Sequence, residues 1–210
     1  MRRLLQEEIE DQLSEDLKDG FTIIERGSRR LIRTIDSILN LSQLQFGSLE
    51  VHKTNIDLLE IIDQVVIEFK KLAAAKNIDI VAETNLTECS IYIDHYTVTQ
   101  LIANLVDNAI KYSSAGTITI SVSRQDDKIK LKVSDTGIGM SEEFVQKLFE
   151  PFTQEETGYS RRFEGTGLGL ALVKKYCEIN KASIDVQSKK GVGTTFTIYF
   201  KERKVTPVKA

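Results

Sequence analysis

The chain has 210 residues, 41% of them hydrophobic and 28% charged, and its formal net charge is -3. This length suits one compact domain with an appendage and is short for two full-sized domains. The composition is typical of a soluble globular protein and excludes a disordered or fibrous one. Because neither sign of charge dominates, nucleic-acid binding is not predicted, although the end from Lys201 to Lys209 is locally basic.

No membrane span, signal peptide, disulfide framework or zinc site is predicted. No apolar run approaches the roughly 20 residues that cross a bilayer, and the start, MRRLLQEEIEDQ, lacks the apolar core of a signal peptide. Cys89 and Cys177 have no CxxC spacing and no companion histidines nearby. We therefore expect a protein of the reducing cytoplasm.

A long amphipathic helix is predicted from Ser14 to Phe46. Its apolar residues form two adjacent rows with helical and heptad spacings: Ile24, Leu31, Ile35 and Ile38, then Ile32, Leu39 and Phe46. The stripe is wider than one small domain would cover, which favours partner helices, with packing on its own domain as the alternative. Because Arg2 to Asp11 reads as the end of another helix, residues 1–47 are predicted to form a truncated helical hairpin.

Mixed elements are predicted over residues 48–202, followed by a tail at residues 203–210. The expected helices are Asp57 to Lys76, Tyr96 to Tyr112 and Leu168 to Asn180. The expected strands are Leu49 to His52, Ile78 to Glu83, Ser90 to Ile93, Thr117 to Arg124, Lys128 to Ser134, Ser183 to Ser188 and Thr194 to Phe200. Helices beside a largely antiparallel sheet predict an α+β fold, a two-layer α/β sandwich.

A polar stripe is predicted near the end of the helix that closes at Tyr112. Within NLVDNAIKYS, the side chains of Asn104 and Asn108 project from one face, with Lys111 three residues further on. Amide oxygens suit a hard cation such as magnesium as single ligands, and a lysine meets a phosphate as a point charge. Taken alone, the segment leaves an ordinary solvated helix face as the alternative.

A second candidate site segment is DTGIGM, whose first residue, Asp135, ends the strand KIKLKVSD. The carboxylate of Asp135 can accept a hydrogen bond from an adenine amino group, whereas guanine carries a carbonyl at that position. Gly137 and Gly139 would let the backbone approach a ligand closely. An acid that merely caps a turn is the alternative, and Glu142 replaces the third glycine of a dinucleotide fingerprint.

A third candidate site segment is GTGLGL, which lies at the start of the predicted helix LALVKKYCEI. Its amides and the positive helix end could hold phosphate, with a glycine hinge as the alternative. No GxxxxGK[ST] sequence occurs, so an ATP site here is not a P-loop. Between FEPF and Gly165, the polar run TQEETGYSRRFE predicts a mobile cover whose Arg161 or Arg162 reaches a phosphate, or else an idle surface loop.

The chain resembles sensor histidine kinases in the order and spacing of its short motifs. NLVDNAIKYS resembles the asparagine box of that family, DTGIGM its first glycine box, FEPF its phenylalanine box and GTGLGL its second glycine box, and GVGTTF closes the series. The resemblance covers about Leu49 to Phe200. It implies the Bergerat-type ATP-binding fold shared with DNA gyrase and certain heat-shock chaperones, with ATP and Mg²⁺ as cofactors and a flexible lid over the nucleotide.

Carried over by position, the resemblance implies a role for each matching residue. Asn108 would hold magnesium, Asn104 and Lys111 would face the phosphates, Tyr112 would lie beside the adenine, and Asp135 would read its amino group. Asn104, Lys111 and the lid arginines would serve the phosphoryl transfer. The remaining pocket and lid positions are Gly137, Gly139, Phe152, Gly165, Thr166, Gly167, Leu168 and Gly169, with Thr194 touching the adenine side through water.

The resemblance extends to the long helix, because GFTIIERGSRRLIRTIDSILNLSQLQFGSL is similar to the second helix of the family's dimerisation hairpin. The first helix of that hairpin should carry a histidine followed by an acid. This chain departs from the pattern, since its histidines are His52, on an apparent strand, and His95, at a helix start. We therefore expect the acceptor histidine to precede Met1 or to lie elsewhere, and no self-phosphorylation of this chain.

The resemblance implies a protein-histidine kinase that transfers the γ-phosphoryl of ATP to a histidine for relay to an aspartate of a response regulator. A homodimer through the hairpin is expected, in a cytoplasmic protein or the cytoplasmic part of a larger sensor. The alternatives are an ATP-hydrolysing relative of gyrase and heat-shock chaperones, a serine kinase of the anti-sigma-factor type, and a degenerate binding module. Asn104 argues against hydrolysis, because the hydrolysing relatives have a glutamate there as general base.

Overall fold

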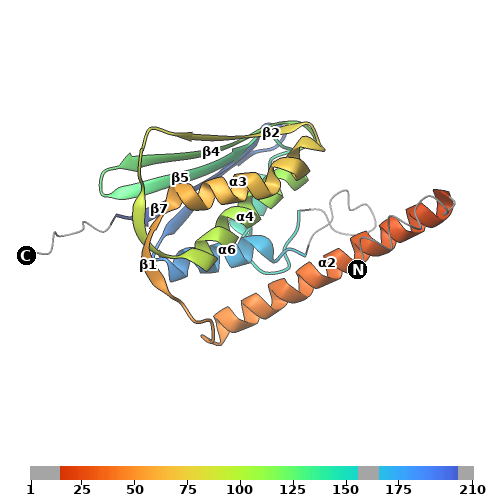
Figure 1. Ribbon diagram of the computed structural model, residues 1–210, viewed down its shortest axis with the longest axis horizontal. Coiled ribbons are helices and arrows are strands. Elements are labelled where there is room, and N and C mark those ends of the chain that lie inside the picture. The colour runs from red at the N-terminus through yellow and green to blue at the C-terminus, as the bar shows by residue number, and fades with distance from the viewer. Residues whose placement is uncertain (1–14, 156–165, 203–210) are drawn as a thin grey trace, which may run out of the picture.

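A five-stranded sheet carries three helices on one face (Figure 1). The computed structural model describes residues 15–155 and 166–202. In sheet order the strands are β2 (Ile78–Thr84), β4 (Gly116–Gln125), β5 (Lys128–Asp135), β7 (Gly193–Lys201) and β6 (Ser183–Lys189). Only β2 and β4 pair in parallel. The helices are α3 (Leu58–Ala74), α4 (His95–Tyr112) and α6 (Gly169–Ile179). The predicted two-layer α/β sandwich is confirmed.

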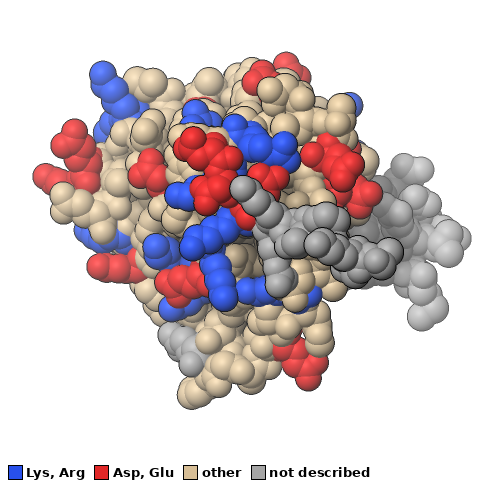
Figure 2. Space-filling model, turned by 90° about the vertical axis from the view of Figure 1, so that its left-hand side faces the viewer, with Lys and Arg blue, Asp and Glu red and all other residues tan. Residues whose placement is uncertain are grey.

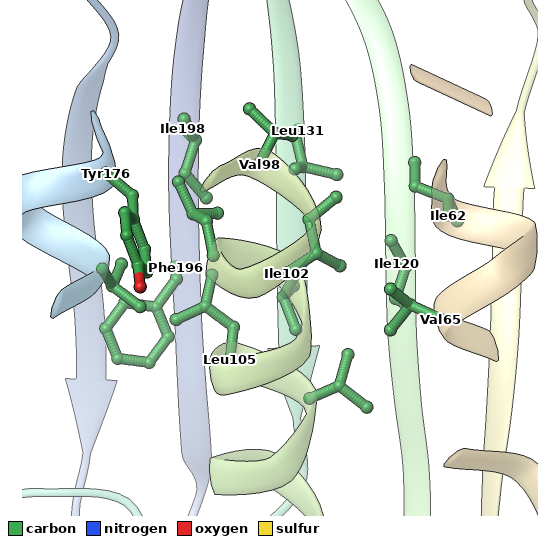
Figure 3. Packing of buried hydrophobic residues seen from close by; sticks show 14 of the residues in the cluster. Ile62, Val65, Val98, Ile102, Leu105, Ile120, Leu131, Tyr176, Phe196 and Ile198 are labelled. Carbon is green, nitrogen blue, oxygen red and sulfur yellow. The ribbon is translucent and has the colours of Figure 1, made fainter. Parts of the chain in front are cut away.

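The sheet faces its helices with alternate residues, as a period of two requires. In β4 and β5, buried aliphatic residues alternate with partly exposed threonine, serine and lysine, and the ladder pairs Ile120 with Val133 and Val122 with Leu131. Figure 3 shows these strands meeting Ile102 and Leu105 of α4. This fully buried layer fixes α4 across the middle of the sheet.

The start of α4 is held by a buried polar network. Asp94 caps the helix by accepting from the Thr97 amide at 2.8 Å and also accepts from the His52 amide at 2.9 Å. Asn180, at the end of α6, accepts from the Asp94 amide at 2.9 Å and donates to Thr97 Oγ1 at 2.8 Å. Lys53 Nζ donates to the carbonyl of Ile179. The network joins α4, α6 and the segment that follows the long helix.

The long helix α2 (Glu15–Gln45) contacts the sandwich near its C-terminal end, where Leu41 is buried and Leu44 packs on the core. Further along towards its N-terminal end, apolar side chains are exposed, namely Leu17, Phe21, Ile24, Leu31, Ile32, Ile35, Ile38 and Leu39. The predicted first helix of the hairpin and the tail at residues 203–210 lie outside the described residues.

The predicted strand from Leu49 to His52 is wrong. The structure instead pairs β1 (Lys53–Asp57) with β3 (Ser90–Asp94) in a separate two-stranded antiparallel sheet. A short helix that was not predicted, α5 (Glu142–Gln146), follows β5 and is capped by Ser141, which accepts from the Phe144 amide at 3.3 Å.

No helix in residues 15–155 or 166–202 has the length and apolarity needed to cross a membrane. On the molecular face shown in Figure 2, basic and acidic side chains are interspersed. That face therefore does not present a field of one sign to a partner.

Candidate functional site

The predicted polar stripe lies on α4 where the first turn of α6 approaches. Asn104 donates from Nδ2 to the Gln100 carbonyl at 2.7 Å, which leaves its amide oxygen for another partner. A Cβ on Gly169 would lie 3.0 Å from that oxygen and 3.9 Å from Asn108 Nδ2. Glycine at this position thus lets the start of α6 sit beside both asparagines.

The last turn of α4 presents a cation. Lys111 Nζ donates to the hydroxyl of Tyr112 at 2.9 Å and lies 4.5 Å from the centre of its ring. A carbonyl of the same turn, that of Ile110, accepts from Lys76 Nζ at 2.9 Å. Lys76 therefore occupies the helix end, while Lys111 is held on the tyrosine beside it.

Asp135 closes β5 beside the end of α4. Its carboxylate accepts from the Gly137 amide at 2.8 Å, and the backbone of Thr194 on the adjacent strand also bonds it. Burial raises the pKa of this carboxyl, and the two backbone hydrogen bonds only partly oppose the effect. The loop that follows is fixed to α4, because the Ile138 amide donates to the Tyr112 carbonyl at 3.1 Å.

Three glycines lie close to backbone carbonyls around the end of β5. A Cβ on Gly137 would lie 2.6 Å from the Tyr112 carbonyl oxygen, and one on Gly139 would lie 2.0 Å from the Lys189 carbonyl oxygen. Gly193, with φ of +134°, would place a Cβ 2.1 Å from the Asp135 carbonyl oxygen. These glycines allow close approach of three chain segments to the end of β5. Thr194 reaches the same place, with its hydroxyl 2.8 Å from Ser188 Oγ.

A backbone hydrogen bond joins FEPF (149–152) to GTGLGL (165–170). The Phe152 amide donates to the Gly167 carbonyl at 3.0 Å, while the Phe152 side chain is 67% exposed. Thr166 Oγ1 accepts from the Leu168 amide at 3.3 Å, and Leu168 is fully buried in the core. Of the predicted pocket residues, Phe152 thus contributes a backbone hydrogen bond, and Leu168 contributes packing in the core.

Comparison with known protein families shows to which family the chain belongs. Residues 93–204, more than half of the chain, match the family described as histidine kinase-, DNA gyrase B- and HSP90-like ATPase. The chain belongs to this family. The matched range contains every predicted site residue, from Asn104 to Thr194.

The similarities within the family are to sensor histidine kinases. The autoinducer 2 sensor kinase/phosphatase LuxQ of Vibrio parahaemolyticus is 26% identical over 98% of this chain and 25% of its own length. The Acinetobacter baumannii histidine kinase AdeS superposes with a TM-score of 0.72 at 26% identity, covering 91% of this chain and 87% of that one.

A third solved structure, histidine kinase ThkA in complex with response regulator protein TrrA, has a TM-score of 0.72 at 24% identity. It covers 95% of this chain and 56% of that chain, and at this identity it shows the fold alone. The chain spans a quarter of the length of LuxQ and a comparable share of other curated relatives, 35% and 19% in two of them.

Several residues of this ATPase-family site fall outside these observations. Arg161, Arg162 and Gly165, predicted for the lid, lie outside the described residues.

Sequence reasoning overlooked Ser113, the last residue of NLVDNAIKYS, which is only 3% exposed. Its hydroxyl has no hydrogen-bond partner among the described residues. Its position directly after Tyr112 was the available signal.

Adenine nucleotide and magnesium fit the residues present. The Asn104 amide nitrogen donates to the Gln100 carbonyl, which leaves the amide oxygen for a ligand, and Gly169 places no side chain against that oxygen. Asp135 offers a partly buried acceptor beside the C-terminal end of α4. Residues 15–155 and 166–202 contain no cluster of three or more His, Cys, Asp or Glu able to hold a metal ion. A cation here would therefore use amide and phosphate oxygens, which magnesium accepts.

Proposed function

We propose that the chain is the ATP-binding catalytic domain of a sensor histidine kinase, which transfers the γ-phosphoryl of ATP to a histidine. The observation that supports this proposal is that candidate ligand-binding residues gather at two points along α4. Asn104 and Asn108 meet Gly169 at one of them, and Asp135 meets the end of the helix at the other. Eight residues from Asn104 to Tyr112 correspond to about 12 Å of helix, which separates a phosphate end from an adenine end.

Each end has the chemistry for its part of the nucleotide. We assign magnesium to Asn108, the phosphates to Asn104 and Lys111, and the adenine to Tyr112 and Asp135. The amide oxygen of Asn108 suits a hard cation, and the charge of Lys111 complements a phosphate. For the lid, we propose that Arg161 or Arg162 reaches a phosphate and that the glycines from Gly165 shape the lid. The resemblance of the sequence motifs supports this part of the proposal.

Bound Mg·ATP would supply the transferable phosphoryl group and partial neutralisation of its charge. The chain's residues contribute mainly by positioning, with Asn104 and Lys111 fixing the phosphates and Asp135 fixing the base. An asparagine amide cannot remove a proton from water, so Asn104 disfavours hydrolysis. This favours phosphotransfer over the activity of the hydrolysing relatives.

The acceptor histidine is proposed to lie on another segment or another molecule. His52 and His95 are both exposed, and neither belongs to α2. Relay to an aspartate of a response regulator is proposed by analogy with ThkA, whose structure is a complex with such a protein. A cytoplasmic location is proposed from the two free buried cysteines, Cys89 and Cys177, which a reducing compartment would keep unpaired.

The test is phosphoryl transfer in trans. The chain would be incubated with Mg²⁺ and γ-labelled ATP, with and without a histidine-kinase hairpin that carries its histidine. We expect acid-labile label on the hairpin and none on the chain alone, together with ATP binding by calorimetry. Steady ATP hydrolysis that an Asn104→Ala variant abolishes would instead support the hydrolysing alternative, and absence of nucleotide binding would support a binding module.

We further propose that the exposed apolar stripe of α2 forms a homodimer interface. Residues such as Leu31 and Ile35 are about half or more exposed, and apolar side chains repeated along a helix are typical of a helix-bundle seam. We expect sedimentation to show a monomer–dimer equilibrium that a Leu31→Glu, Ile35→Glu double variant shifts to monomer. A Gln43→Glu variant, altered at an exposed polar position, should leave the equilibrium unchanged. A wild-type monomer at high concentration would contradict this.

A further inference from the structure

The side chain of Ser113 lies at the adenine end of the proposed pocket with its hydrogen bonding unsatisfied. Ser113 caps the end of α4 through its backbone amide, which donates to the Ala109 carbonyl at 3.1 Å. Its hydroxyl oxygen is buried and has no partner among the described residues. It is the only such buried side-chain atom in those residues. Because burying an unpaired hydroxyl costs free energy, native proteins keep few of them, and an unpaired one often marks a functional position.

The hydroxyl points to the same place as the carboxylate of Asp135. A Cβ built on Gly137 would lie 2.9 Å from Ser113 Oγ and 2.8 Å from Asp135 Oδ1. The two oxygens are therefore separated by less than about 6 Å, a distance that one bridging water or a rotation about χ1 of the serine can close. Gly137 carries no side chain that would occupy the position close to both oxygens.

Asp135 has capacity for another donor. An ionised carboxylate can accept about four hydrogen bonds, and the backbone of Gly137 and of Thr194 supply two. An adenine amino group would supply a third. A fourth acceptor position remains, and a carboxylate taken this far from water gains from filling it.

We propose that Ser113 is a positioning residue for nucleobase recognition, and that its hydroxyl donates to the Asp135 carboxylate, directly or through one water, when adenine nucleotide is bound. The bond orients the carboxylate towards the adenine amino group and so contributes to selection of ATP. This inference rests on the proposed ATP-binding function. It adds a residue whose effect should appear only when the ligand carries an amino group.

Calorimetric titration of the full chain tests the proposal with two probes, ATP and purine riboside triphosphate, which lacks the amino group. We expect Ser113→Ala to weaken ATP binding about tenfold and to leave binding of purine riboside triphosphate within about twofold of wild type. Ser113→Thr, which keeps the hydroxyl, should retain the preference for ATP. Thermal unfolding without nucleotide should show Ser113→Ala to be at least as stable as wild type, because the substitution removes an unpaired buried polar atom.

Three results would overturn the inference. They are unchanged ATP affinity in Ser113→Ala, equal weakening for the two nucleotides, and loss of stability without nucleotide, which would indicate a structural role. Failure of the wild-type chain to bind ATP at all would instead overturn the proposed function. Binding by wild type that is lost in Asp135→Asn but kept in Ser113→Ala would overturn only the role of the serine.

Discussion

Replacing Asp135 by asparagine should weaken ATP binding by about 10- to 100-fold, the range expected when a hydrogen bond to a charged group is lost. The amide presents donors where the adenine amino group requires an acceptor, and such a donor suits the carbonyl of guanine better. The ratio of ATP to GTP affinity should therefore fall. Calorimetric titration with both nucleotides measures this ratio. An Asp79→Asn variant, altered at an exposed strand position, serves as the control. An unchanged ratio would contradict the assignment of Asp135 to the base.

The stability of the wild-type chain should depend on pH through Asp135, in the opposite sense from that of an acid whose pKa is lowered in the folded state. Burial raises the pKa of Asp135 in the folded chain, so the wild-type protein loses stability as pH rises from the unfolded pKa through the higher folded one. The Asp135→Asn variant lacks this loss. Denaturant unfolding without nucleotide should show the variant gaining relative to wild type across that interval, then a constant difference. A variant that is destabilised across the same interval would show that ionisation of Asp135 stabilises the fold.

Replacing Gly193 by alanine should destabilise the protein by about 3 kcal/mol or more, because it adds a clash to backbone strain. The new Cβ would lie 2.1 Å from the Asp135 carbonyl oxygen, and φ is +134°. Gly191, two residues earlier, also has a positive φ of +77° but has nothing within 4 Å of its Cβ position. Gly191→Ala should therefore cost only the strain of about 1–2 kcal/mol.

The comparison of these two glycine variants separates crowding from strain within one turn. Denaturant unfolding gives the free energies, and ATP titration of the folded fraction gives the effect on the site. We expect Gly193→Ala to weaken ATP binding, because relief of the clash displaces the end of β5, and Gly191→Ala to bind as wild type. Equal losses of stability in the two variants would show that β5 and β7 can separate at this end without cost.

The sandwich was predictable from the sequence because its elements are strongly periodic. Alternating apolar residues define β4 and β5, and the 3.6-residue period defines α3, α4 and α6, so these were located to within a few residues. The strand predicted from Leu49 to His52 was wrong because Leu49 and Val51 mimic alternation. The true strand β1 is largely polar, with Ile56 as its only strongly apolar residue, and is defined by pairing with β3. Such pairing is tertiary information.

The site was predictable as a set of motifs, but its contacts were not. The spacing of Asn104 and Asn108 on one helix face follows from helical geometry alone. That Gly169 faces both, and that Gly193 packs on Asp135, depends on how α6 and β7 meet their neighbours across the sheet. The unpaired hydroxyl of Ser113 is a property of packing as well, since a serine at a helix end is ordinarily solvated.

The parts of the candidate site come from segments that are distant in the chain, with Asn104 on α4, Asp135 at the end of β5, Gly169 on α6 and Thr194 on β7. None of the segments can form the pocket until the antiparallel ladder from β4 to β7 has closed and α6 has docked beside α4. Formation of the pocket therefore requires the tertiary structure of the whole sandwich. By mass action, nucleotide at 100 times its dissociation constant would shift the folding equilibrium by about 2.7 kcal/mol, so the ligand would act as a folding partner for the whole sandwich.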